Sequence, residues 1–300
     1  MKPTSIIFLI VSLVIVLVGL GTAGIASRLA VSQDVELGMV AQEDGNYYSR
    51  PEFDAENIGK INISVERATV NIIGGSDKSY IELVNFTDGM YAAASTNRVF
   101  TLSDGTDLAS FSGIISMVSN FNGLRAFVDG FNMRKLDRTV NVYLNSDYPV
   151  NAFEISLGEG VVNIKNNRTL TDYYVTVEEG DVNITDVGTT SVVKVTVGEG
   201  RVRVDDCDIE QMSVSIKSGD VTAVSQINRF TAAIETGDFS YSSYSPFAST
   251  NVKLAASSGV ITVDGSQVGG YMQTSDAATG NMIDAVVSFG DITIKTETPR

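Results

Sequence analysis

The stretch Val175–Ile184, VTVEEGDVNI, recurs twenty residues later as Val195–Val204, VTVGEGRVRV. Each copy has a glycine at its centre, Gly180 or Gly200, and an apolar residue at every second position on either side. Alternation with a period of two is typical of β-strands that bury one face. The apolar positions are an odd number of residues apart across the glycine, so the chain must turn there. Glycine supplies the unusual backbone angles that such a corner needs.

The same pattern surrounds seven glycines along the chain. At positions −7, −5, −3, +2 and +4 from each of them, all thirty-five residues are apolar or tyrosine, and the positions between are mostly polar. An eighth copy, Ile61–Ile72, has Ala68 in place of the glycine. The seven are Gly160, Gly180, Gly200, Gly219, Gly237, Gly259 and Gly290.

A period near twenty residues with only strand signals predicts an all-β fold. The predicted architecture is a single-stranded parallel β-helix, or β-solenoid, with rungs of about twenty residues in which each rung stacks on the next in chain order. One rung buries too few side chains to fold alone, so we expect backbone hydrogen bonds and buried faces shared between neighbours to stabilise the array.

The N-terminus differs sharply from the repeats. Its apolar part begins at Ile6, small residues continue to Ala26, and no charge occurs between Lys2 and Arg28. About twenty such residues can cross a bilayer as a helix. We therefore expect residues 6–26 to contact the lipid bilayer as an uncleaved transmembrane anchor. A cleaved signal peptide remains the alternative.

This anchor sets the expected organisation of the chain. Residues 1–30 are the anchor, residues 31–57 a linker and residues 58–300 the solenoid. The acidic bulk of the chain suits the outer side of the membrane, which predicts a single-pass protein of the cell membrane with a cytoplasmic N-terminus and an extracytoplasmic domain.

Residues 76–150 interrupt the repeat. Three segments in this region look like strands, SYIELVNF, NRVFTLSDG and RTVNVYL. Between the last two, six apolar residues fall roughly on one helical face, which predicts a short amphipathic helix in an insert at residues 103–135. They are Ile114, Met117, Val118, Phe121, Val128 and Phe131. This insert could cap the open end of the solenoid or bind a partner or the membrane surface.

The repeated corners GEGVVNI, EEGDVNI, KSGDVTA and FGDITI resemble the bacterial "putative adhesin" domain family, as does the lead-in run VNVYLNSDYPVNAFEISLGEG. The resemblance covers about Ile61–Ile294. It implies a β-solenoid, often anchored in the membrane by an N-terminal helix, and a role in the cell envelope or in adhesion. It implies no catalytic residues, since this family of unknown function has no established ones.

Composition excludes several classes of function. The net charge is −15 and the chain has neither histidine nor tryptophan. An acidic surface repels nucleic acids, so we expect no nucleic-acid partner. The absence of histidine removes the commonest general acid/base and metal ligand. The single cysteine, Cys207, lies in the run DDCD, where nearby carboxylates would raise its pKa and make it a poor nucleophile.

Two groups of residues are candidates for a site. The first is the set of acids beside the corner glycines, which could bind calcium if stacking brings them together, or could be ordinary turn residues. The second is the set of tyrosines Tyr173, Tyr174, Tyr241 and Tyr244, which could stack on sugars. The acids are Glu159, Glu179, Glu199, Asp181, Asp220, Asp238 and Asp291.

The sequence therefore predicts a membrane-anchored, extracytoplasmic β-solenoid that acts as an adhesin-like interaction, envelope scaffold or sensing module. No catalytic, cofactor-binding or metal-binding residue is assigned, and no enzymatic activity is expected. The expected partner is an envelope protein or a glycan. The alternative is a solenoid that binds or cleaves polysaccharide.

Overall fold

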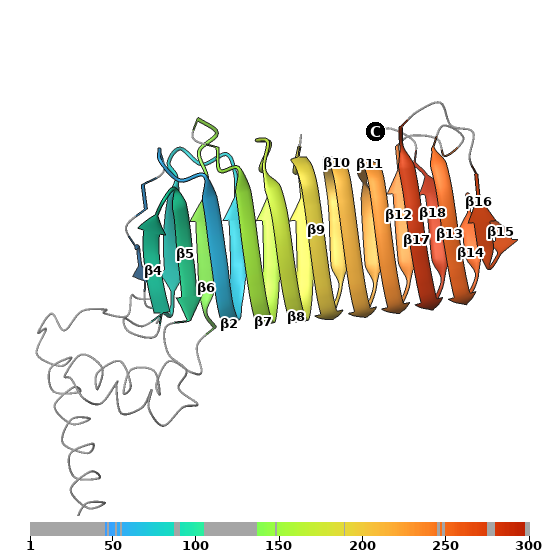
Figure 1. Ribbon diagram of the computed structural model, residues 1–300, viewed down its shortest axis with the longest axis horizontal. Coiled ribbons are helices and arrows are strands. Elements are labelled where there is room, and N and C mark those ends of the chain that lie inside the picture. The colour runs from blue at the N-terminus through green and yellow to red at the C-terminus, as the bar shows by residue number, and fades with distance from the viewer. Residues whose placement is uncertain are drawn as a thin grey trace, which may run out of the picture.

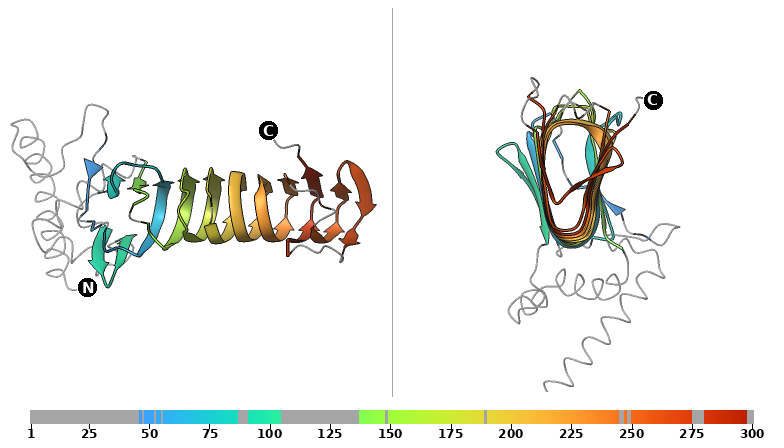
Figure 2. Two further views of the ribbon diagram at one scale, coloured as in Figure 1. Left: turned by 90° about the horizontal axis from the view of Figure 1, so that it is seen from above. Right: turned by 90° about the vertical axis from the view of Figure 1, so that its right-hand side faces the viewer.

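The computed structural model describes residues 46–86, 91–104, 137–274 and 280–297, apart from positions 47, 52, 55, 148, 189, 245, 246, 248 and 249. These residues form one eighteen-stranded sheet that winds into a long, flattened coil (Figure 1). Viewed end-on in the right panel of Figure 2, the coil is a narrow, flattened loop. Apolar side chains fill its interior. The expected all-β, largely parallel architecture is confirmed.

The strands vary from two to seventeen residues because some of them continue through a corner. In chain order they are β1 (Tyr48–Ser49), β2 (Lys60–Ile73), β3 (Tyr80–Val84), β4 (Tyr91–Thr96), β5 (Val99–Asp104), β6 (Thr139–Tyr143), β7 (Ala152–Lys165), β8 (Asp172–Thr185), β9 (Thr190–Glu199), β10 (Val202–Ser218), β11 (Val221–Thr236), β12 (Phe239–Ser243), β13 (Asn251–Ser258), β14 (Ile261–Val263), β15 (Ser266–Gly269), β16 (Tyr271–Gln273), β17 (Met282–Phe289) and β18 (Ile292–Thr296).

Successive turns of the coil pair in parallel, and the register matches the sequence repeat. Strands β7 and β8 align Gly160 with Gly180, an offset of twenty residues. The same parallel pairing continues from β8 through β9, β10 and β11. Equivalent residues of each repeat therefore lie side by side, one strand spacing apart, which is about 4.8 Å.

The alternating apolar positions form the core. Of the thirty-five positions around the seven glycines, thirty-four are buried, and Val263 in the last turn of the array is half-buried. The apolar residues of the eighth copy, from Ile61 to Ile72, are buried as well. The inward faces of all the turns thus join into one continuous cluster along the coil.

The corner glycines are required by how closely the turns stack. Six of the seven have φ between +132° and +148°, a region that residues with a side chain rarely adopt. A Cβ atom added at any of the seven would lie 1.7–2.0 Å from the corner carbonyl oxygen of the adjacent turn. At Gly180 that oxygen belongs to Gly160. We call the stacked residues the corner column: in spatial order Ala68, Gly160, Gly180, Gly200, Gly219, Gly237, Gly290 and Gly259.

The end of the coil that contains β1–β6, the near end, explains why Ala68 can replace glycine. Strands β5 and β6 both pair with β2 and make up the turn beyond it, but their register leaves a gap opposite Val65–Ala68. Ala68 can carry a side chain because no described residue of β5 or β6 is paired with it across this gap. Asp104 and Arg138 on its two sides form an ion pair, and Asp104 accepts a hydrogen bond from the Glu66 N–H at 2.6 Å.

At the other end, the far end, the turns do not stack in chain order. Strand β17 pairs with β11 on one side and with β13 on the other, so the Gly290 turn lies between the Gly237 and Gly259 turns. The expectation that Gly259 stacks directly on Gly237 is wrong. The long spacing of 31 residues from Gly259 to Gly290 contains β15 and β16, which pair antiparallel with β14 and β13 and cover the last turn.

Antiparallel strands thus cover both ends of the parallel array. At the near end β3 pairs with β6, β4 with β5, and β1 with β3. Exposed edges of parallel strands invite pairing with other chains, and such short antiparallel strands limit that risk. The three strands expected between residues 76 and 150 are present as β3, β5 and β6. Strands β5 and β6 pair in parallel with β2, whereas β3 belongs to the antiparallel covering.

Two expectations lie outside the described residues. These are the membrane helix over residues 6–26 and most of the insert at residues 103–135, of which only its first two residues are described, at the end of β5. Within the part of the chain that the structure describes, no helix has the length and hydrophobicity to cross a bilayer. Strand β1 lies within residues 31–57, the range predicted as a linker, but it pairs with β3 and is part of the sheet.

We call the buried positions −7, −5, −3, +2 and +4 around the corner glycines the inward column. This assignment can be tested by placing an aspartate at either of two adjacent residues. Val195 is 1% exposed in the middle of the array, whereas the next residue, Thr196, points outward and is exposed. Val195→Asp should abolish folding because it buries an unpaired carboxylate. Thr196→Asp should change the free energy of unfolding by less than about 0.5 kcal/mol. Urea unfolding of both variants, followed by circular dichroism, measures the difference, and equal stabilities would contradict the assigned column.

The need for glycine in the corner column can be tested by substitution. Gly180→Ala should lower the free energy of unfolding by about 2–6 kcal/mol, the sum of backbone strain and overpacking against the Gly160 carbonyl. Gly280→Ala is the matched control, since none of the described residues lies within 4 Å of the added methyl group there. A Gly180→Ala protein as stable as the control in the same urea titration would show that close corner stacking is not needed.

Candidate functional site

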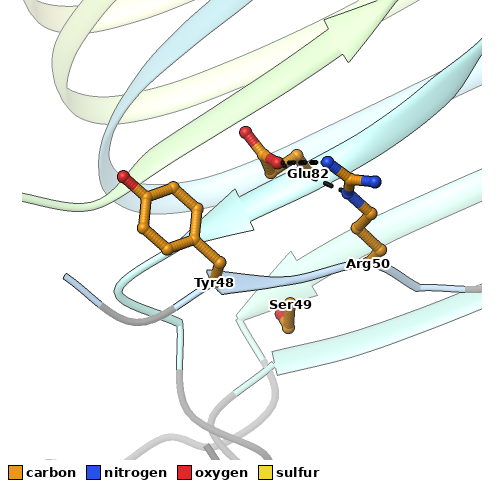
Figure 3. Close-up of a pocket in the computed structure, with 4 residues that line it drawn as sticks. All are labelled: Tyr48, Ser49, Arg50 and Glu82. Carbon is orange, nitrogen blue, oxygen red and sulfur yellow. Dashed lines mark hydrogen bonds and ion pairs between the residues drawn. The ribbon is translucent and has the colours of Figure 1, made fainter. Parts of the chain in front are cut away.

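The near end has a hollow of about 430 Å³ in the outer surface, lined by Tyr48, Ser49, Arg50 and Glu82. We call it the near-end pocket (Figure 3). The short strand β1 forms one side of it, because Tyr48 and Ser49 pair antiparallel with Val84 and Leu83 of β3. Side chains alternate along a strand, so Tyr48 and Arg50 share the face on which Glu82 lies, as Figure 3 shows.

An ion pair forms the polar centre of the pocket. The Arg50 Nη2 and Nε atoms donate to Glu82 Oε1 at 3.0 and 3.4 Å. The other carboxylate oxygen, Oε2, lies 3.5 Å from Asn141 Nδ2. The side chain of Glu82 is 14% exposed and that of Arg50 is 65% exposed, so the carboxylate is fixed and the guanidinium faces solvent.

Two stacked aromatic rings pack against the arginine of this ion pair. The rings of Tyr80 and Tyr143 stack with centroids 4.4 Å apart, and the Arg50 guanidinium lies 4.7 Å from the Tyr80 centroid. The hydrogen bond to Glu82 raises the pKa of Arg50, and burial raises the pKa of Tyr143. Arginine stays charged at any physiological pH. The pair therefore offers a fixed donor beside a fixed acceptor, which suits binding rather than proton transfer.

A row of amides runs from the pocket along the outer face of the coil. Asn71 donates to Asn141 at 2.8 Å, Asn163 to Asn71 at 2.9 Å, and Asn183 to Asn163 at 3.0 Å. Such ladders form when parallel turns bring identical side chains into register, and they stabilise the stacking. Through Asn141, the row continues up to the Glu82 carboxylate.

The acidic residues after the corner glycines have a structural role. The Asp238 carboxylate accepts the Asp291 N–H at 2.7 Å, and Asp291 accepts the Val260 N–H at 2.8 Å. Asp220 and Asp181 likewise accept from the next turn. Each aspartate thus accepts a hydrogen bond from a backbone N–H of the neighbouring corner. This bond favours aspartate at the position directly after the corner glycine.

The glutamates before the glycines do stack as expected. Glu159 pairs in register with Glu179, and Glu179 with Glu199. Arg67 of the adjacent turn lies 3.4 Å from Glu159 and offsets part of the repulsion. Among the residues that the structure describes, no group of three or more acidic, cysteine or histidine side chains converges as a metal ion would require.

Cys207 is buried just after a second corner. Its neighbour Asp206 has φ of +51°, and the Cys207 N–H donates to Ser225 Oγ at 3.1 Å. Burial raises the pKa of the thiol to about 11, and the Asp206 charge adds to this shift. The pKa was expected to rise because of nearby carboxylates; the direction is right, but burial is the main cause. The thiol is therefore inert at neutral pH.

The four candidate tyrosines do not form one site. Tyr173 and Tyr241 are fully buried, as their inward positions imply, and the Tyr173 hydroxyl accepts a hydrogen bond from Asn167 Nδ2 at 2.5 Å. Burial raises the pKa of both phenols. Tyr174 is exposed on the outer face, and Tyr244 is half-buried beyond β12. The structure does not gather them into a sugar-binding surface.

The sequence analysis missed Arg50 and Glu82. They are 32 residues apart, in segments outside the glycine repeat, and one of them falls in the predicted linker. The only local signal is the alternation in Tyr80–Val84, which places Glu82 outward between buried Ile81 and Leu83. No spacing rule connects that position with a two-residue strand upstream.

The comparisons with known proteins agree with the repeat architecture. The family model of Toastrack DUF4097 matches residues 58–282. The chain belongs to the Toastrack DUF4097 family. This family identification confirms the resemblance seen in the corner motifs, and no curated protein matches the chain.

Several solved structures of bacterial proteins align with this chain. A "putative adhesin" from Bacteroides fragilis aligns with a TM-score of 0.51 and 14% identity, covering 87% of this chain and all of that one. A "putative adhesin" from Parabacteroides merdae aligns with a TM-score of 0.41 and 12% identity over 86% of this chain and 98% of that one. A "putative cell adhesion protein" from Clostridium sporogenes aligns with a TM-score of 0.35 and 13% identity, covering 84% of this chain and 99% of that one. At 14% identity, the first alignment shows a shared fold.

The role of the corner aspartates can be tested by substitution. Asp238→Ala removes the acceptor of the Asp291 N–H and should lower the free energy of unfolding by about 1 kcal/mol. Asp208→Ala, at an exposed strand position, should change it by less than about 0.5 kcal/mol. Urea titrations with and without 5 mM calcium chloride, a concentration on the order of the weakest protein calcium sites, measure both effects. Stabilisation by calcium that disappears in Asp238→Ala would contradict the structural role.

Proposed function

We propose that this chain is a single-pass membrane protein whose extracytoplasmic β-solenoid acts as an adhesin-like interaction or envelope scaffold module, without catalysis. The observation that carries the proposal is the continuous parallel array itself, in which stacked corners fix rows of outward side chains along a long rigid surface. Repeat arrays of this kind serve as extended binding surfaces. The adhesin name of the Bacteroides fragilis protein, which shares the fold, supports the same role.

The N-terminal sequence supports the location. Residues 6–26 are long and apolar enough for a membrane span, and the chain that follows is strongly acidic. An acidic domain is repelled by anionic headgroups, which favours a domain held near the bilayer by its anchor rather than by its surface.

The near-end pocket supports binding rather than chemistry. Its carboxylate, Glu82, pairs with Arg50 and not with a second carboxylate, and the sequence contains no histidine. Hydrolysis of a glycosidic bond generally needs two carboxyl groups on either side of the scissile bond. Within the polysaccharide alternative, the pocket therefore favours binding of a polysaccharide over its cleavage.

Membrane anchoring and the interaction role can be tested in the native host. The full-length protein should stay with membranes after alkaline carbonate extraction, and protease added to spheroplasts should digest its solenoid. Crosslinking on intact cells should then capture a defined envelope protein or glycan with this chain. The double variant Leu13→Arg/Val16→Arg should lose membrane retention, whereas Val16→Leu should keep it, because charges in the apolar core of a span oppose insertion.

N-terminal sequencing of the extracted protein separates the two alternatives for residues 1–30. An intact N-terminus supports the anchor, and a chain that begins after Ala26 supports a cleaved signal peptide. A solenoid that is protected from protease, or turnover of a polysaccharide that one carboxylate substitution abolishes, would contradict the proposed function.

A further inference from the structure

The near-end pocket is a concave, polar site built on strands, and nothing in the repeat requires it. We propose that it binds a neutral sugar ring, the exposed unit of an envelope or host glycan. The inference rests on the proposed interaction role and names a ligand for it.

The ion pair matches two neighbouring hydroxyl groups. Arg50 directs Nε and Nη2 at the same oxygen, Glu82 Oε1, which leaves Nη1 as a donor toward solvent. Glu82 Oε2 has Asn141 at 3.5 Å and retains acceptor capacity. One sugar hydroxyl can accept from the guanidinium while the next donates to the carboxylate. A neutral ligand of this kind bridges the pair without breaking it.

The aromatic groups fit the same ligand. Tyr48 lines the hollow beside the ion pair and presents an amphipathic ring, which can cover the C–H face of a sugar. The stacked Tyr80 and Tyr143 lie behind Arg50 and restrict its guanidinium through the contact at 4.7 Å. A side chain held in place before binding loses little entropy when the ligand arrives. The pocket is thus pre-organised on its polar side.

Charged ligands fit less well. An anion that approaches Arg50 also meets Glu82 beside it, on a chain with a net charge of −15. A cation must compete with the guanidinium for Oε1, which Arg50 already contacts at 3.0 Å. A zwitterion such as a free dipeptide would have to separate the pair to reach both charges. The chemistry of the pocket therefore favours a polyhydroxylated, uncharged ring.

The test is a binding measurement with defined probes. The full-length protein in detergent is titrated with the methyl glycosides of glucose, galactose, mannose and N-acetylglucosamine, and with glycylglycine. Saturation-transfer NMR and calorimetry report binding. At least one methyl glycoside should bind saturably, and glycylglycine should not. Arg50→Met and Glu82→Gln should each weaken that binding by at least about tenfold, the loss expected for a hydrogen bond to a charged group.

Matched controls come from an ion pair elsewhere on the coil. Arg67 and Glu159 are 3.4 Å apart and exposed on neighbouring turns, so Arg67→Met and Glu159→Gln change the same residue types away from the pocket. Both should bind the sugar as the wild type does. Thermal unfolding checks that all variants are folded. If Glu82→Gln unfolds, Arg50→Met decides alone, since Arg50 is 65% exposed and its truncation leaves no cavity.

Three results would overturn the proposal: no methyl glycoside binds, glycylglycine binds in an Arg50-dependent way, or sugar binding is equal in Arg50→Met and Arg67→Met. None of them affects the interaction role, because a crosslinked envelope partner would still support it. Conversely, the protein could bind a sugar and yet be absent from the membrane fraction. That result would support the assignment of the pocket and refute the membrane-anchored module.

Discussion

The structure depends on one steric constraint, the contact between the backbone of each corner and the corner of the turn beside it. A side chain at Gly180 would lie 1.7 Å from the Gly160 carbonyl oxygen, and the same holds along the corner column. Glycine lets the turns come close enough for hydrogen bonds on both sides of the corner. The parallel register then follows, and with it the burial of nearly all the inward positions. Ala68 is tolerated because neither β5 nor β6 is paired with it, so no described corner of that turn lies against its side chain.

This register also determines what the outer surface can do. It places asparagine on asparagine and aspartate beside a backbone N–H, so most of the polar groups that look like candidate ligands are already satisfied by the next turn. A translationally repeated surface offers many equal positions and no unique one. Specific chemistry therefore needs a place where the repeat is broken, and the near end is such a place, since β1 and β3 run antiparallel to their neighbours there.

The sequence was enough to predict the repeat unit, because alternation and glycine spacing are local. It predicted the inward column at Gly160, Gly180 and Gly200 residue by residue. It could not predict that Gly290 stacks between Gly237 and Gly259, because that order depends on how β15 and β16 cover the last turn. The acidic corners were recognised as a motif, but whether a carboxylate meets a cation or a backbone N–H is decided by the position of the neighbouring turn.

The pocket lies beyond sequence reasoning for the same physical reason. Its ion pair joins Arg50 to Glu82 through the pairing of a two-residue strand, which carries no periodic signal. Tyr80 and Tyr143 become a stacked pair only because β3 runs antiparallel to β6. A parallel array stabilises itself through equivalence between turns, whereas its ends must be closed by segments that have no equivalent. Those closing segments are free of the constraint that fixes the corners, so they are where a sequence can acquire a site without disturbing the stack.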